Sequence, residues 1–338
     1  MAGTVLVSGG SGYIAGYLIR QLVAAGWTVH TTVRNLAREA PLRQVLAVDD
    51  TRLRVFAADL MADAGWADAM AGCSHVAHLA SPLPAGVPRH ADELIVPARD
   101  GALRALRTAR DAGVQRFVMT SSVAALSYGR GRGVHRFTEA DWTDLSRPGL
   151  TPYVQSKTVA ERAARDWVAR EGGGLSFCSI CPSVVLGPVW GPDYSASVAV
   201  VQKLLDGSLR ALPDFGFSVV DVRDVADLHL RALTAPGLDG ERFIAAGRFM
   251  MLREVAEVLR TALGPQADRV STRTVADWLV RLAALFNPVA RAVVGELGSV
   301  RQLDASHARA VLGWATRPVE QSIVDCARSL LAQGLVRA

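Results

Sequence analysis

Tyr153 and Lys157 are the two residues of this sequence whose types and spacing are best suited to chemistry. They lie four positions apart, after a threonine and a proline that are typical of a helix start, so one helix face is predicted to carry both side chains. The chain has five tyrosines and only two lysines, and chance would produce this spacing in ~3% of such chains. A phenol donates a proton poorly at neutral pH, because its pKa lies near 10. A neighbouring ammonium and a cofactor cation would stabilise the phenolate and lower that pKa, as general acid catalysis requires.

A glycine-rich turn near the N-terminus predicts a binding site for the phosphates of a dinucleotide. An apolar strand at 5–7 leads into the turn, and a helix with an apolar stripe follows it. Gly9 allows the sharp turn, Gly12 lets the backbone approach a pyrophosphate, and the small Ala15 allows the helix to pack close to the sheet. The free N–H groups at the helix start then face the anion.

The residue that follows the second strand indicates which dinucleotide binds. This strand is predicted at 27–33, and Arg34 comes next, where an NAD-binding unit places an acidic residue for the ribose 2′-hydroxyl. A cation at that position favours the 2′-phosphate of NADP, whereas a solvated surface arginine is the alternative. Arg38 and Arg43 are near enough in sequence to help hold the phosphate, but the sequence leaves their direction open.

Strands and helices alternate through the first half of the chain. Further strands are predicted at 53–58, 75–80, 116–120 and 175–181, with helices at 97–112 and from Pro152. This alternation predicts an α/β fold with a doubly wound parallel (Rossmann) sheet, whose ligand lies beyond the carboxyl ends of the strands. Asp59, Ala80 and Ser122 fall at such ends. Asp59 either reaches the adenine amino group or caps the next helix, and the sequence favours neither role.

Beyond residue 183 the chain is predicted to leave the sheet for a smaller, mainly helical substrate lobe. The dinucleotide-binding domain is predicted at 1–183 and 219–247, and the lobe at 184–218 and 248–338. The lobe has large apolar residues that suit an aryl or alkyl carbonyl compound, although such residues more often form core. They are Trp190, Tyr194, Leu204, Leu205, Phe215 and Phe217. The acids of 221–224 are expected to cap a helix.

The composition is that of a mildly basic enzyme. Half of the 338 residues are hydrophobic, yet no run approaches the ~18 apolar residues of a membrane span, and the first strand begins too early for a signal peptide. A cytoplasmic location is therefore expected. The net charge of +5 is spread along the chain, so no nucleic-acid or membrane partner is expected. Four cysteines and scattered histidines match neither a disulfide framework nor a ligand spacing, and no metal is predicted.

The chain resembles the extended short-chain dehydrogenases/reductases, and within them the dihydroflavonol-reductase-like group of NADP-dependent aldehyde, ketone and flavonoid reductases. The resemblance covers nearly the whole chain, in segments 9–15, 32–34, 57–60, 120–122, 153–157, 187–188 and 221–226. It implies a catalytic Ser, Tyr and Lys, and the order of residues matches Ser122 better than its neighbour Ser121. Two positions depart from the pattern. Ala15 replaces the usual third glycine, and Cys181 precedes Pro182 where asparagine is more common.

The predicted activity is NADPH-dependent reduction of a small, largely apolar aldehyde or ketone. Hydride passes from the nicotinamide to the carbonyl carbon while Tyr153 protonates the oxygen; Ser122 holds that oxygen, and Lys157 also grips the nicotinamide ribose. The predicted cofactor contacts are Gly9, Ser11, Gly12, Tyr13, Ile14, Arg34, Asp59, Leu60, Ala80, Tyr153, Lys157, Pro182 and Ser183. The expected partner is a small carbonyl or alcohol compound, and the expected assembly is a monomer or homodimer.

Three alternatives accompany this prediction: a sugar-nucleotide epimerase or dehydratase, a 3β-hydroxysteroid dehydrogenase, and a regulatory protein that senses NADP. Arg34 argues against the first, because such enzymes usually keep a tightly bound NAD. The serine, tyrosine and lysine argue against the sensor, because a sensor has no use for a proton donor. The steroid dehydrogenase stays open.

Overall fold

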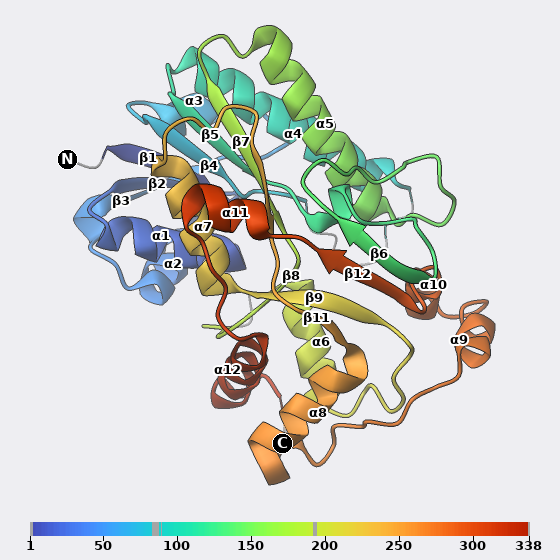
Figure 1. Cartoon of the computed structure of the whole chain (residues 1–338). Coiled ribbons are helices and arrows are strands. Elements are labelled where there is room, and N and C mark those ends of the chain that lie inside the picture. The colour runs from blue at the N-terminus through green and yellow to red at the C-terminus, as the bar shows by residue number, and fades with distance from the viewer. Residues whose placement is uncertain (1–2, 83–87, 89, 192–194, 337–338) are drawn as a thin grey trace.

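Short runs of β-branched and apolar residues form a seven-stranded parallel sheet. The computed structural model describes residues 3–82, 88, 90–191 and 195–336. In spatial order the strands are β10 (Arg242–Ala245), β7 (Ser176–Pro182), β5 (Arg116–Thr120), β4 (His75–His78), β1 (Thr4–Ser8), β2 (Thr28–Val33) and β3 (Leu53–Ala57). The order reverses between β1 and β4, which is where doubly wound sheets bind their ligands. The predicted doubly wound sheet is confirmed (Figure 1).

Helices cover both faces of this sheet, because each helix buries an apolar stripe against it. One face carries α1 (Tyr13–Ala24), α7 (Val222–Thr234) and α11 (Ser306–Leu312), and the other carries α3 (Trp66–Met70), α4 (Asp92–Asp111) and α5 (Pro152–Glu171). Figure 1 shows the first group in front of the sheet and the second group behind it. A short helix, α2 (Glu39–Leu46), packs beside α1.

Helix α4 begins five residues earlier than its sequence predicts. The proline signal suggested a start at Pro97, but the helix starts at Asp92 and keeps Pro97 in its second turn. Leu94 and Ala98 are buried on the same stripe as the later alanines, so packing against the sheet extends the helix towards its N-terminus. Acidic residues in the first turn also suit the helix dipole. Tertiary packing here outweighs the loss of one backbone N–H.

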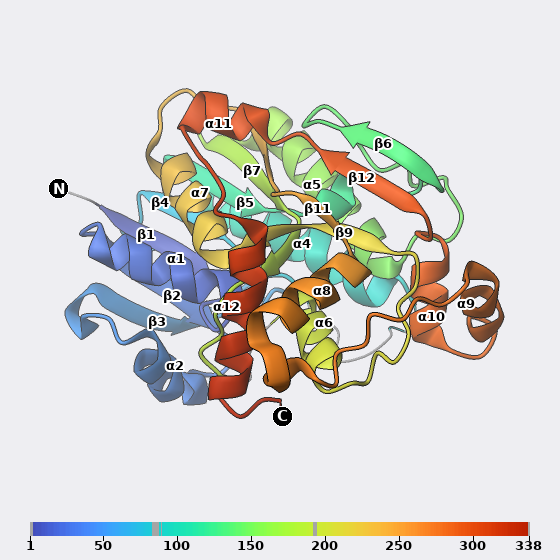
Figure 2. The ribbon, with the colours of Figure 1, turned by 60° about the horizontal axis from the view of Figure 1, so that its bottom comes forward.

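A second hydrophobic core lies below the carboxyl ends of the sheet. It is enclosed by a three-stranded sheet in the order β11 (Phe249–Met251), β9 (Gly216–Asp221) and β8 (Val184–Leu186), and by α6 (Ala196–Leu205), α8 (Leu252–Leu263) and α12 (Val319–Ala332). Figure 2 shows α6, α8 and α12 gathered on this side of the molecule. Leu204, Leu205 and Phe217 are buried in this core, so they are core residues and do not line a substrate pocket. Tyr194 lies outside the described residues.

Two strands far apart in sequence form a separate parallel pair, which the sequence did not predict. They are β6 (Gly133–Phe137) and β12 (Ser299–Leu303). Before β12 come two short helices, α9 (Asp277–Ala283) and α10 (Pro288–Val294). The remaining elements are 3-10 turns: η1 (Leu36–Arg38), η2 (Asp50–Arg52), η3 (Val123–Ala125) and η4 (Gly264–Ala267).

The chain passes between the large sheet and the lobe several times. The predicted boundary at 218/219 falls inside β9, which pairs with β8 and β11, while α11 returns from the C-terminal segment to pack on the large sheet beside α7 and β10. The division into two domains at the stated residues stays a prediction. No helix in the described part of the chain is long and apolar enough to cross a membrane. All four cysteines are buried and unpaired.

Candidate active site

The start of α5 places Tyr153 and Lys157 on one helix face, as predicted. Thr151 caps the helix, because its Oγ1 accepts a hydrogen bond from the Val154 N–H at 3.3 Å, and Pro152 occupies the first helical position. The Lys157 Nζ lies 6.0 Å from the centre of the Tyr153 ring. The tyrosine side is open to the cleft, with 38% of the residue exposed, whereas the lysine is 8% exposed.

The end of β5 presents two serines, and the structure separates their surroundings. The Tyr153 hydroxyl donates to the Ser122 Oγ at 3.4 Å. Ser121 turns the other way and donates to the Glu161 carboxylate at 2.6 Å. Adjacent residues of an extended chain point to opposite sides, so only one of the two can face the tyrosine. Ser122 is the serine that lies beside Tyr153.

A buried ion network lies directly behind this pair. Glu161, one turn after Lys157, is completely buried and accepts hydrogen bonds from Ser121, from Ser179 at 2.7 Å and from Arg242 at 2.9 Å. Arg165 adds a salt bridge at 3.2 Å from the more exposed side. Burial by itself raises the pKa of Glu161, but the two arginines outweigh it and hold the pKa below its usual value. The network therefore fixes the end of β5 to α5.

Burial is the first cause of the pKa shifts of the tyrosine and the lysine, although the tyrosine is 38% exposed and the lysine only 8%. Burial raises the pKa of Tyr153, and the hydrogen bond to Ser122 only partly offsets that effect. In the chain alone the tyrosine pKa is therefore raised, and the expected lowering by Lys157 is not found. Burial lowers the pKa of Lys157 to about 8, against the opposing influence of Cys181 and Glu161. The lysine therefore changes its charge near neutral pH.

The glycine-rich turn lies close to the residues after β4, and its backbone conformation favours glycine. Gly9 has a φ of +72°, and a Cβ at this position would lie 3.1 Å from the Ala80 Cα. Its N–H donates to the Thr32 Oγ1 at 3.0 Å, and Ala80 is held by its own N–H bond to the Ser8 Oγ at 3.0 Å. Ser8, Thr32 and Ala80 thus build the turn, and the sequence did not predict the role of Thr32.

Helix α1 begins directly at this turn, and no side chain makes a capping hydrogen bond at its N-cap. Gly12 is its N-cap and makes no side-chain capping bond, so the N–H groups of Tyr13 and Ile14 are left for a ligand. Two serines that line the same cleft, Ser183 and Ser195, have buried hydroxyls with no hydrogen-bond partner among the described residues. These groups fit the phosphates and polar edge of a dinucleotide.

One cleft brings most of the predicted residues together. Ser122 and eight of the thirteen predicted cofactor contacts line it: Gly9, Gly12, Tyr13, Ile14, Tyr153, Lys157, Pro182 and Ser183. Ser11 lines a second cleft on the other side of the turn, and Ala80 lies beneath Gly9. Arg34, Asp59 and Leu60 line neither of these two clefts.

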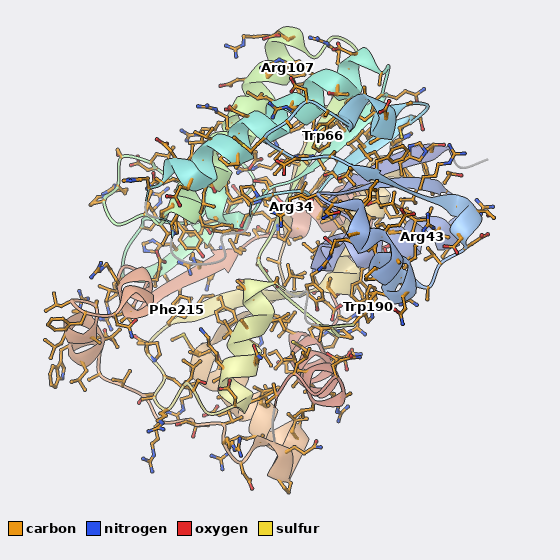
Figure 3. The ribbon with its side chains drawn as sticks, turned by 180° about the vertical axis from the view of Figure 1, so that it is seen from behind. Arg34, Arg43, Trp66, Arg107, Trp190 and Phe215 are labelled. Atoms are coloured by element: carbon orange, nitrogen blue, oxygen red, sulfur yellow. The ribbon has the colours of Figure 1, made fainter. Side chains whose placement is uncertain are left out.

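The three arginines near the end of β2 have different surroundings. Arg43 is occupied, because its guanidinium contacts Glu39 at 2.9 Å, Asp50 at 2.8 Å and the Leu53 carbonyl at 3.0 Å. Arg34 is exposed at the strand end, and Arg38 lines the second cleft beside the glycine-rich turn. Figure 3 shows Arg34 near the middle of the molecule and Arg43 at its outer flank. Arg43 is therefore not available to hold a phosphate.

Asp59 and Leu60 follow β3 and are held by local contacts. The Asp59 carboxylate accepts the Met61 N–H at 2.8 Å and so closes a turn. It does not cap the next helix, because the N-cap of α3 is Gly65. Leu60 packs against α4, where a Cβ on Gly101 would come within 2.7 Å of it. The proposed approach of Asp59 to the adenine stays a prediction.

Trp190 takes a place that the sequence did not suggest. It stacks on Tyr17 of α1 with ring centres 4.0 Å apart. The Arg20 guanidinium makes a cation–π contact with it, and the Arg20 Cζ lies 4.9 Å from the ring centre. It lines the second cleft, next to Ser11 and Arg38, and does not line the cleft with Tyr153. This tryptophan belongs to the glycine-rich-turn side of the molecule (Figure 3).

Comparisons with known proteins cover most of the chain. The family model described as the NAD dependent epimerase/dehydratase family matches residues 5–246. Cinnamoyl-CoA reductase CAD2 of Medicago truncatula is 33% identical over 270 residues, which are 77% of this chain and 80% of the relative. A dihydroflavonol 4-reductase of Zea mays is 30% identical over 272 residues, 76% of this chain and 74% of the relative.

Solved structures share the fold over nearly the full length. The yeast methylglyoxal/isovaleraldehyde reductase Gre2, solved in complex with NADPH, superposes with a TM-score of 0.80 over 98% of this chain and 100% of that chain. The two sequences are 22% identical, so this similarity shows the fold alone.

Proposed function

The chain belongs to the NAD dependent epimerase/dehydratase family of extended short-chain dehydrogenases/reductases, and from this premise we propose that it is an NADPH-dependent carbonyl reductase. Its substrate is a small, largely apolar aldehyde or ketone. The observation that carries the proposal is the hydrogen bond of 3.4 Å between Tyr153 and Ser122, with Lys157 one helical turn away in the same cleft. Two relatives that match three quarters of the chain are named as reductases, which supports the same activity.

The residues of the cleft divide the work of reduction. When bound, the reduced nicotinamide supplies the hydride that the carbonyl carbon accepts. Ser122 holds the carbonyl oxygen by a hydrogen bond, and Tyr153 donates its hydroxyl proton to that oxygen, so that an alcohol and a phenolate result. The Lys157 ammonium stabilises the phenolate until the tyrosine takes up a proton from solvent. Ile14, Leu79 and Val185 line the cleft and suit an apolar substrate.

The cofactor is held by backbone N–H groups, by two arginines and by a serine hydroxyl. The N–H groups at the start of α1 face the pyrophosphate, Arg34 and Arg38 take the 2′-phosphate, and the Ser183 hydroxyl gains a partner at the nicotinamide end. A cytoplasmic enzyme that is a monomer or homodimer remains the expectation.

The choice of NADPH is tested by replacing Arg34 with serine. We expect the KM for NADPH to rise about ten- to a hundredfold, because one charge-assisted hydrogen bond to a phosphate is lost, and the KM for NADH to stay the same. Initial rates with both cofactors against aldehydes, aryl ketones, diketones and ketosteroids measure this. Arg43→Ser is the matched control, since Arg43 is already occupied by Glu39 and Asp50 and should leave both constants unchanged.

Other outcomes of the same assay would redirect the proposal. A wild-type enzyme that turns over faster with NADH would contradict the assignment of Arg34. No turnover with either cofactor, together with tightly retained NAD, would favour an epimerase or dehydratase. Tight binding of NADP without turnover would favour a sensor.

The rate of reduction is expected to fall as the pH rises through about 8. Burial lowers the pKa of Lys157 to about 8, so the ammonium is present below this pH and is lost above it, together with its stabilisation of the phenolate. The measurement is kcat/KM for NADPH between pH 6 and pH 10, because this constant reports the pKa values of the free enzyme. The Lys157→Arg variant shows whether the lysine or the tyrosine causes the fall. Its guanidinium stays charged up to pH 10, so its rate should not fall as the pH rises through about 8. Identical profiles for the two enzymes would show that another group titrates.

A further inference from the structure

Helix α9 and the turn after it carry a large exposed apolar surface, which we call the α9 patch. Its members are Trp278, Leu279, Leu282, Leu285 and Phe286. Trp278 is 64% exposed, Leu285 65% and Phe286 84%. Of the eleven large hydrophobic side chains that are exposed in the described part of the chain, five lie in these nine residues. Single exposed apolar residues are ordinary, whereas a contiguous group marks a contact surface.

Helix α9 and the turn after it have two apolar faces. One face is buried against the rest of the chain, and the other face is the exposed patch. Val280 and Ala284 point inward and are buried, which accounts for the packing of α9 on the rest of the chain. Trp278, Leu282 and Leu285 are spaced by four and three residues, so they form one stripe on the outer side. The exposed fractions of these side chains show that the described residues leave the outer stripe uncovered.

The patch is held in a defined position at the edge of the molecule. Figures 1 and 2 both show α9 at the periphery, beyond α10 and away from the central sheet. Arg132, from the loop before β6, holds Asp277 at the start of α9 with a salt bridge of 2.8 Å. At the other end, Arg291 donates to the carbonyls of Ala284 and Leu285 at 3.1 and 3.2 Å. The helix is thus anchored at both ends with its apolar side outward.

Arginines outnumber acids in the segment around the patch. Residues 268–291 include four arginines and two acids, Asp268 and Asp277, and Asp277 is paired with Arg132. Arg273 and Arg281 are exposed, and neither forms a salt bridge with an acidic residue that the structure describes. A partner surface of apolar and negatively charged groups complements this combination.

We propose that the α9 patch docks the enzyme on a membrane surface that contains anionic lipid. A second copy of the chain fits less well, because two identical patches would bring their arginines together, and nine residues are far fewer than the ~20–30 per side of a stable dimer interface. A projecting apolar tip with a flanking tryptophan and arginines suits the boundary of headgroups and acyl chains. The protein lies on the membrane surface, and this proposal replaces the expectation from the spread net charge that the protein has no membrane partner. Docking concerns a surface apart from the cleft, and it does not depend on the proposed reaction.

The test is co-sedimentation of the full-length protein with vesicles of phosphatidylcholine alone and of phosphatidylcholine with phosphatidylglycerol. We expect binding to the anionic vesicles, weakened by salt, and an at least about tenfold loss of affinity in a Trp278→Ser/Phe286→Ser variant. The variant Arg273→Gln/Arg281→Gln should bind anionic vesicles more weakly than the wild type does. Its binding to vesicles of phosphatidylcholine alone should equal that of the wild type. The control is Met61→Ser/Val311→Ser, which removes two exposed apolar side chains from other elements.

Each other result overturns the proposal. These outcomes are equal binding of the patch variant and the wild type, no binding to anionic vesicles, or a dimer in light scattering that the patch variant dissociates. All substituted positions are exposed, so unchanged circular dichroism and an unchanged thermal midpoint are expected for every variant.

Discussion

Tyr153→Phe is expected to lower kcat for carbonyl reduction by about a hundred- to ten-thousandfold, the usual contribution of one positioned general acid. The substitution removes only the hydroxyl that donates to Ser122 and keeps the ring beside Lys157. Affinity for NADPH should fall by less than about tenfold, because at most one neutral hydrogen bond to the cofactor is lost. Stopped-flow single turnovers and fluorescence titration of the cofactor measure the two quantities separately.

The two adjacent serines provide the matched control for this result. Ser122→Ala should lower kcat, since Ser122 faces the tyrosine, and should cost about 1 kcal/mol of stability, since its hydroxyl also caps η3 by accepting the Ala124 N–H. Ser121→Ala should affect stability more than kcat, since its hydroxyl belongs to the buried network of Glu161. A Tyr153→Phe enzyme that keeps its rate within about tenfold would show that the proton comes from another donor.

Glu161→Gln is expected to destabilise the protein by about 3–5 kcal/mol. Arg242 is 5% exposed and has its carboxylate partner in Glu161, so the substitution leaves a buried guanidinium without its counter-charge. Urea denaturation followed by circular dichroism measures the loss. Glu171→Gln lies on the same helix at an exposed position and should change the free energy of unfolding by less than about 0.5 kcal/mol.

A double variant tests the reason for that loss. Glu161→Gln/Arg242→Met removes both charges, so it should recover part of the stability that Glu161→Gln loses. Part of the wild-type free energy of unfolding depends on the ionised Glu161 carboxylate. The pKa of this group in the folded protein lies below its usual 4.5. The stabilisation is therefore complete above pH 4.5 and is lost as the pH falls through the folded-state pKa. Glu161→Gln should lack this component. Equal stability losses in the single and double variants would exclude an uncompensated charge as the cause.

Local sequence patterns determined most elements of the large sheet and most of the residues that meet in the cleft. The turn at Gly9 and Gly12 and the helix start at Thr151 involve neighbouring positions, and the backbone geometry of a few residues decides each. Tyr153 and Lys157 share a face because a helix repeats every 3.6 residues. Alternating strands and helices were enough to predict the doubly wound sheet, and the rules for such sheets place strand ends together.

Only the tertiary structure decided which of several similar residues faces the site. Ser121 and Ser122 differ because the hydroxyl of Ser121 donates a hydrogen bond to Glu161, forty residues later in the chain. Arg43 cannot hold a phosphate because its guanidinium forms a salt bridge with Asp50. Leu204 and Leu205 cannot line a pocket because they are buried in the core that α6, α8 and α12 complete. The pairing of β6 with β12 and the outward face of α9 likewise depend on segments far apart in the chain. Local backbone geometry is encoded in adjacent residues, whereas the direction of a side chain depends on partners that only folding brings near.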